Sequence, residues 1–270
     1  MNKNNLILEY KKVFNDEKNK RVFFAPGRVN LIGGHVDYHG GKVLPCAINF
    51  GTYLVISKRE DNKIKGYSYN FEEIGIIENN INDLEYNKSD DWFNFVKGVI
   101  FKLKEKGIKI NKGFNMYFKG NIPNGAGLSS SASLELVILE ALDTILETGL
   151  TKKEKTFIAK DVENNYIGVN CGIMDQYSIA FGKKDYAILL DCDSNTHKYV
   201  PFKINGYKIM IINTNKERKL ADSKYNKRRK ECKKGLDILL TNSKKEKYKD
   251  LDLFDYNDYK DKINNLESRI

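Results

Sequence analysis

Cysteine and proline are scarce in this sequence of 270 residues, and each scarcity excludes a class of protein. The four cysteines lie far apart and form no CxxC pair, so we expect reduced thiols rather than a disulfide scaffold or a metal site. Four prolines and 20 glycines exclude a collagen-like chain. Residues 1–14 lack the apolar core of a signal peptide, and no apolar run reaches the ~18 residues of a membrane span. The sequence therefore predicts a cytoplasmic protein with no membrane partner.

Basic residues outnumber acidic residues, 46 to 36, which gives a formal net charge of +10. The 58 residues from Asn213 onward hold 17 Lys/Arg and 11 Asp/Glu, which is a net +6. No zinc-finger spacing, RNP-type aromatic pattern or helix-turn-helix accompanies this charge. A solvated basic surface is the simpler interpretation, so we expect no nucleic-acid partner; anionic small molecules remain an alternative.

The remaining composition is that of a folded protein, with 41% hydrophobic residues and 11% aromatics. Hydrophobic periodicity predicts helices at 6–14, from Trp92 onward, from the Gly/Ser loop near residue 130 to Gly149, at 153–165 and at 225–240. Strands are predicted at 21–24, 43–49, 52–58, 63–69, 113–119, 186–190 and 209–212. This mixture predicts an α+β fold, with a change of domain near 190–205 and a polar tail.

The segment 123–133, PNGAGLSSSAS, lies where a strand gives way to a long helix. Glycines let an anion approach the backbone, and the N–H groups and dipole of the helix start attract it. The segment is neither a Walker A loop nor a GxGxxG fingerprint. A helix N-cap explains such a segment equally well when it is read alone, but its length favours phosphate binding.

Two further segments gather polar side chains. In 26–41, PGRVNLIGGHVDYHGG, five glycines surround Arg28, His35 and Asp37, an arrangement suited to hydrogen-bonding a polyol. A core histidine and a turn-forming aspartate are the alternatives for His35 and Asp37. In 168–176, GVNCGIMDQ, Asp175 could equally be a helix cap.

Together the three segments closely resemble the galactokinase branch of the GHMP small-molecule kinases. In that family a sugar motif, a PxGxGLSSSAS phosphate loop and a GIMDQ motif occur in this order, and the segments 92–99 (WFNFVKGV) and 223–229 (SKYNKRR) match it as well. The resemblance implies the GHMP kinase fold, with an N-terminal ribosomal-S5-like α/β domain at 1–195. Residues 196–270 would then begin a ferredoxin-like domain, which we expect to be incomplete because the sequence ends before the family's third Gly-rich motif.

The resemblance assigns the nucleotide to one set of residues. The ATP phosphates would lie on Gly125, Ala126, Gly127, Leu128, Ser129, Ser130 and Ser131. Ser131 and Glu163 would hold Mg²⁺, which prefers a few hard oxygen ligands. Trp92 would lie beside the adenine and Ser68 near the nucleotide, although the spacing of Trp92 alone suits a core residue equally well.

The resemblance also assigns the sugar site, to Gly34, His35, Val36, Asp37, Gly172 and Tyr225. Asp175 would accept the proton of the C1 hydroxyl as general base, and Arg28 would stabilise the transferring phosphoryl group. An adjacent Arg⁺ keeps a carboxylate ionised but makes it a weaker base, so Asp175 acts either as base or as an electrostatic orienter. The family's usual GEHTDYN reads GGHVDYH here, so Gly34 stands in place of a Glu that contacts the sugar.

The implied function is the transfer of the ATP γ-phosphoryl group to the anomeric hydroxyl of galactose in galactose metabolism, by a monomer. The alternatives are a catalytically silent galactose and ATP sensor, an inactive truncated kinase, and a GHMP kinase for another sugar such as N-acetylgalactosamine. Sensors lose residues of the phosphate loop, whereas Ser131-Ala132 is intact here, which favours catalysis.

Overall fold

A five-stranded sheet organises the larger part of the chain. The computed structural model describes residues 1–123, 126–213 and 223–263. The strands are β1 (Arg21–Asn30), β3 (Pro45–Lys58), β4 (Lys63–Ser68), β5 (Ile77–Asn80) and β6 (Phe114–Gly120). Their order is β1-β3-β6-β4-β5, and only the β4–β6 pair of this sheet is parallel. This mixed sheet, with its helices, is the predicted α+β architecture.

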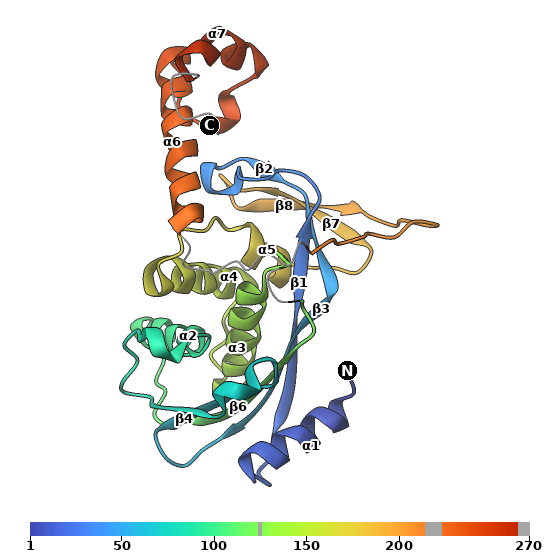
Figure 1. Ribbon diagram of the computed structural model, residues 1–270, viewed down its shortest axis with the longest axis vertical. Helices are drawn as coiled ribbons and strands as arrows, with labels where there is room; N and C mark the ends of the chain where they lie inside the picture. Colours follow the sequence, from blue (N-terminus) through green and yellow to red (C-terminus); the bar gives the residue numbers. More distant parts are fainter. Residues whose placement is uncertain (124–125, 214–222, 264–270) are drawn as a thin grey trace.

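The two faces of the sheet are covered by different helices (Figure 1). On one face lie α2 (Phe93–Glu105), α3 (Ser130–Leu146) and α4 (Lys152–Asp161), and on the other lies α1 (Lys3–Phe14). Alternate residues of a strand point to opposite faces, and the central strands follow this rule. Leu54, Ile56 and Phe118 belong to the large core under α2–α4, whereas Val55 and Tyr117 belong to the small core under α1.

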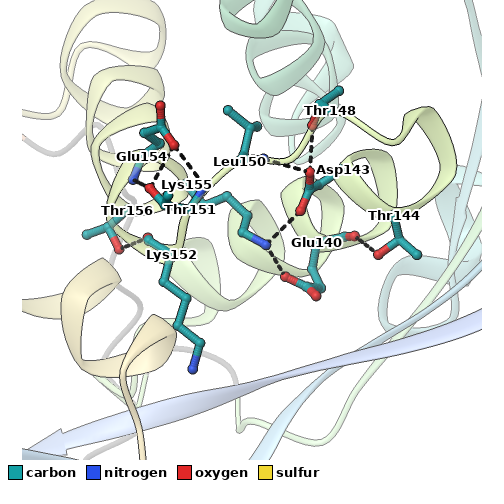
Figure 2. A network of polar contacts seen from close by, with 10 residues as sticks. All are labelled: Glu140, Asp143, Thr144, Thr148, Leu150, Thr151, Lys152, Glu154, Lys155 and Thr156. Carbon is teal, nitrogen blue, oxygen red and sulfur yellow. Dashed lines mark hydrogen bonds and ion pairs between the residues drawn. The ribbon is translucent and has the colours of Figure 1, made fainter.

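A polar network fixes the turn between α3 and α4 (Figure 2). The Lys155 ammonium donates to Glu140 at 2.5 Å and to Asp143 at 2.9 Å. At the start of α4, Thr151 and Glu154 form a reciprocal capping box. The network thereby sets the direction in which α4 leads to the functional residues that follow it.

A second, three-stranded sheet has the order β2-β7-β8, with β2 (Lys42–Val43), β7 (Tyr186–Asp191) and β8 (Thr196–Pro201). The short helix α5 (Met174–Ala180) packs on it through an apolar cluster that includes Ile173, Tyr177 and Ile188. Beyond it, α6 (Ser223–Ser243) and α7 (Leu253–Ile263) extend to one end of the molecule (Figure 1). Within the described ranges, no helix is both long and apolar enough to cross a membrane.

Most predicted elements are confirmed, with the following differences. The strands predicted at 43–49 and 52–58 are one continuous strand, β3. The predicted strand at 209–212 is wrong, because in the described part of the chain this segment pairs with no strand and leaves Met210 82% exposed. The helix predicted at 153–165 is α-helical only to Asp161 and continues as a π-helix over Val162–Ile167. The predicted polar tail contains α7, and the strands β5 and β8 were not predicted.

Candidate active site

An ion pair between Arg28 and Asp175 lies at the centre of the candidate site. Arg28 stands in β1, where the register with β3 shifts, and Asp175 stands in the first turn of α5. The guanidinium makes two parallel hydrogen bonds to the carboxylate, Nε–Oδ1 at 2.8 Å and Nη2–Oδ2 at 2.7 Å. Such a fork fixes the orientation of both groups, and both side chains remain partly open to solvent.

The second half of the Gly/Ser segment lies directly against this pair. Arg28 donates from Nη1 to the Gly127 carbonyl at 2.6 Å, and its backbone N–H donates to the Leu128 carbonyl. The Ser129 hydroxyl donates to the Asp175 carboxylate, and Ser129 has a left-handed backbone with φ of 61°. This approach requires Gly27, because a Cβ there would lie 2.7 Å from the Leu128 oxygen.

The π-helix that follows α4 carries Glu163, and π-helical turns are frequent at functional sites. Burial raises the pKa of the Glu163 carboxyl, and hydrogen bonds from Ser131 and Cys171 oppose that rise. The Ser131 hydroxyl and the Glu163 carboxylate thus lie close together, and both are hard oxygen ligands of the kind that Mg²⁺ binds. In residues 1–123, 126–213 and 223–263 no three His, Cys, Asp or Glu side chains form a metal cluster. Two protein oxygens suit a Mg²⁺ ion, which needs few protein ligands and takes the others from phosphate and water.

The sugar-motif residue Asp37 packs against the loop before α5. A Cβ at Gly172 would lie 1.9 Å from Asp37 Oδ2, so only glycine allows this contact. Burial raises the pKa of Asp37, and the nearby Asp175 raises it further. His35 is exposed, has φ of 60° and pairs through Nδ1 with the Tyr38 hydroxyl at 2.8 Å.

Helix α6 brings Tyr225 to the same place. Its ring centroid lies 6.1 Å from that of His35 and 6.3 Å from that of Tyr38. Burial, followed by the charge of Asp37, raises the pKa of the Tyr225 phenol. Asn226 and Arg229 hold α6 in place through hydrogen bonds to the backbone of residues 168–170.

The other two residues of the predicted sugar motif differ in their surroundings. A Cβ at Gly34 would meet no atom within 4 Å, so this position is open. Val36 packs its side chain against the apolar cluster of the second sheet. Because the Val36 side chain is used in packing, the predicted contact of Val36 with a sugar would be made by its backbone.

A separate pocket of about 150 Å³ contains the residues predicted for the nucleotide base. Ser68 and Trp92 lie in its walls together with Ser130 and Ser131. The indole N–H of Trp92 is buried and has no hydrogen-bond partner among the described residues. Gly125 lies outside the described residues, and Ala126 follows directly after that gap.

Several residues of these pockets were not singled out by the sequence analysis. The pocket beside Trp92 is also lined by Asn70, Phe71 and Asp91, which carry no motif of their own. Glu135 is fully buried beside the site, and neither carboxylate oxygen has a partner among the described residues. A single Glu among the apolar residues 134–139 was the available signal for Glu135.

Two protein-family models match the chain. The model described as "Galactokinase galactose-binding signature" matches residues 8–58, and the model described as "GHMP kinases N terminal domain" matches residues 94–183. The first range contains the Arg28–Asp37 motif, and the second contains the phosphate loop, Glu163 and Asp175.

Similar proteins include galactokinases from several bacteria. The galactokinase of Clostridium perfringens is 56% identical over 218 residues, which cover 81% of this chain and 56% of that protein. The galactokinase of Fusobacterium nucleatum is 50% identical over 244 residues, which cover 90% of this chain and 63% of that protein. The crystal structure of Lactococcus lactis galactokinase complexed with galactose superposes with a TM-score of 0.90 at 41% identity, covering 96% of this chain and 66% of that one. The chain thus spans less than two thirds of each relative.

The fold and the arrangement of the three motifs are those of a GHMP kinase. The Methanococcus jannaschii mevalonate kinase structure, at 19% identity and a TM-score of 0.58, shares this fold. Because both the galactose-binding signature and relatives at 50–56% identity are those of galactokinases, the chain belongs to the galactokinase family. The resemblance and the fold expected from the sequence are confirmed.

Proposed function

We propose that this chain is an ATP-dependent sugar kinase that phosphorylates D-galactose at its anomeric C1 hydroxyl, giving galactose 1-phosphate and ADP. The observation that carries the proposal is the Arg28–Asp175 pair. It contacts the phosphate loop through Gly127 and Ser129, and Asp175 also lies close to Asp37 of the sugar motif. A phosphoryl donor on one side and a sugar hydroxyl on the other would therefore meet at this pair.

On the donor side, the ATP phosphates would lie along Gly125–Ser131, at the N-terminus of the 17-residue helix α3. Backbone N–H groups and the positive end of the helix dipole stabilise phosphate there. The adenine would occupy the pocket beside Trp92 and Ser68. Ser131 and Glu163 would hold Mg²⁺, which when bound neutralises charge on the phosphates.

On the acceptor side, His35, Asp37 and Tyr225 would bind the sugar hydroxyls. Gly172 supports this role by leaving room for the Asp37 carboxylate. The backbone at Gly34 and Val36 would complete the sugar loop. Every residue of the proposed site belongs to one copy of the chain, so a monomer suffices, and all except Tyr225 lie in the predicted N-terminal domain, residues 1–195.

The proposed chemical step takes place at the central pair. The C1 hydroxyl oxygen attacks the γ-phosphorus, a new O–P bond forms, and the bond to the bridging oxygen of ADP breaks. Asp175 accepts the hydroxyl proton, and Arg28 stabilises the charge of the transferring group. Arg28 and Ser129 hold the carboxylate in one orientation, so positioning contributes much of the rate, as is usual in phosphoryl transfer.

The alternative functions differ from the proposed one in turnover or in the sugar used. A silent sensor binds galactose and ATP without turnover, and a kinase for another hexose turns over with a different sugar.

Reduced cysteines and the use of ATP are both in keeping with a cytoplasmic enzyme.

The test uses the full 270-residue chain with Mg-ATP and a panel of galactose, N-acetylgalactosamine, glucose and no sugar. We expect ADP release when the sugar is galactose, and none with the other sugars or without sugar. Asp175→Asn should lower turnover by roughly 10³-fold or more while galactose binding persists. Near-normal turnover by this variant would overturn the proposed mechanism, and galactose-independent or absent ADP release by the wild type would overturn the proposed function.

A further inference from the structure

The outer wall of the nucleotide pocket is built from a loop that precedes α2. This 87–91 loop contains the short 3-10 turn Lys88–Asp90 and ends at Asp91, and Trp92 follows as the N-cap of α2. Asp91 and Trp92 both line the pocket. Asp91 has φ of 43° and ψ of −122°, a backbone conformation that non-glycine residues rarely adopt. Such a conformation persists only where neighbouring groups enforce it.

Asn94, in the first turn of α2, is one such group. Its side-chain amide donates to the Asn87 carbonyl at 2.7 Å and to the Asp91 carbonyl at 3.1 Å. Its side-chain oxygen accepts from the Asn87 N–H at 3.1 Å. Asn94 is 1% exposed, so it ties both ends of the 87–91 loop to α2 in a site shielded from water.

Lys97, one turn further along α2, is the second group. Its ammonium donates to Asp90 Oδ2 at 2.6 Å, and the lysine side chain is 2% exposed. A buried ammonium is costly unless it is paired, so the position of Asp90 is strongly determined by Lys97. The side chains of Asn94 and Lys97 thus both make their hydrogen bonds to the 87–91 loop.

We propose that Asn94 and Lys97 are positioning residues for ATP, which act by holding the 87–91 loop so that Asp91 and Trp92 form a preorganised wall for the base. The inference rests on the proposed function, which assigns this pocket to the adenine of ATP. Neither residue contacts the Arg28–Asp175 pair or the sugar motif. Their loss should therefore weaken nucleotide binding and leave galactose binding unchanged.

The experiment uses the single tryptophan of the chain, Trp92, as an intrinsic fluorescent probe. ATP and galactose are titrated separately into the full chain and into two variants, Lys97→Met and Asn94→Ala. The matched control is Lys102→Met, which removes a lysine from the same helix together with its ion pairs to Glu105 and Asp161. Acrylamide quenching measures how accessible the indole is, and circular dichroism verifies that each variant is folded.

We expect both variants to weaken ATP binding by about tenfold, because binding must then order a loop that the wild type holds in advance. Their acrylamide quenching should rise. Galactose affinity in both, and ATP affinity in Lys102→Met, should stay within about twofold of wild type. Folded Asn94→Ala that binds ATP like the wild type would overturn the inference even if Lys97→Met fails to fold. An equal loss of galactose affinity would also overturn it.

The outcomes separate this inference from the proposed function. A wild type that binds ATP but transfers no phosphoryl group to galactose would contradict the function and leave the positioning role standing if the variants lose ATP affinity. A wild type with galactose-dependent turnover whose variants bind ATP normally would contradict the positioning role alone.

Discussion

Replacing Gly34 by glutamate tests the sugar site by a gain of affinity. The position is exposed, its φ lies outside the left-handed region, and a Cβ there would meet no atom within 4 Å. The chain can therefore accept the side chain without strain. Since the family resemblance places a glutamate here that contacts a sugar hydroxyl, Gly34→Glu should add a hydrogen bond to the proposed galactose site.

The magnitude follows from two opposing effects. A hydrogen bond that involves a charged group contributes about 1.5–3 kcal/mol, or roughly 10- to 100-fold in affinity. Asp37 and Asp175 lie in the same region, so a further carboxylate meets like charge. The exposure of position 34 screens this repulsion, and Arg28 already pairs with Asp175. We therefore expect the lower end of the range, about tenfold tighter galactose binding.

Isothermal titration of galactose into the ATP-free chain measures this effect directly. Gly34→Ala is the matched control, because it adds a Cβ without a hydrogen-bonding group and should leave the affinity within about twofold of wild type. The melting temperature should be similar for all three proteins. Galactose affinity that is unchanged or lower in folded Gly34→Glu would show that position 34 does not face a sugar hydroxyl.

Three further changes test the site and its support. Gly172→Ala should weaken galactose binding at least about tenfold but spare ATP binding, since its Cβ would displace the Asp37 carboxylate; equal losses for both ligands would contradict this. Burial raises the pKa of Glu135 above 4.5, so the folded state retains a proton that the unfolded state releases and stability falls as pH rises. The free energy of unfolding of Glu135→Gln, measured with urea, should equal that of the wild type near pH 4. Above pH 4 it should exceed the wild-type value by up to about 1.4 kcal/mol for each pH unit. Lys155→Met should lower the free energy of unfolding by about 1–3 kcal/mol in the same assay, because Asp143 would lose its ion pair and keep only its hydrogen bonds from Thr148 and Leu150; a loss below 0.5 kcal/mol would contradict that role.

Local patterns predicted much of the fold. The apolar spacing that starts at Trp92 corresponds to α2, and the apolar run after the Gly/Ser loop corresponds to α3. These elements form because each buries an apolar face in the large core, and that face is visible in the sequence. The strand predicted at 209–212 is wrong because local composition does not show which segments pair. Its composition suits a strand, but a strand also needs a neighbour, and no described segment pairs with it.

In the candidate site, the sequence identified the residues but not the contacts between them. The motifs identified Arg28, Asp37 and Asp175 as residues with chemistry, but the hydrogen bond from Ser129 to Asp175 joins positions 46 residues apart. The fork between Arg28 and Asp175 spans 147 residues, and no local pattern encodes such a distance. Lys97 shows the converse, since a lysine on an amphipathic helix is normally solvated and only the fold reveals its burial.

In the proposed mechanism, the Arg28–Asp175 pair brings the phosphoryl donor and galactose together. The most direct test is ³¹P NMR of the full chain with Mg-ATP and galactose, compared with Asp175→Asn under the same conditions. We expect a new sugar 1-phosphate resonance with the wild type, an equal yield of ADP, and neither product above background with the variant. No sugar 1-phosphate from a folded wild type that binds both ligands, or the same yield from the variant, would contradict it.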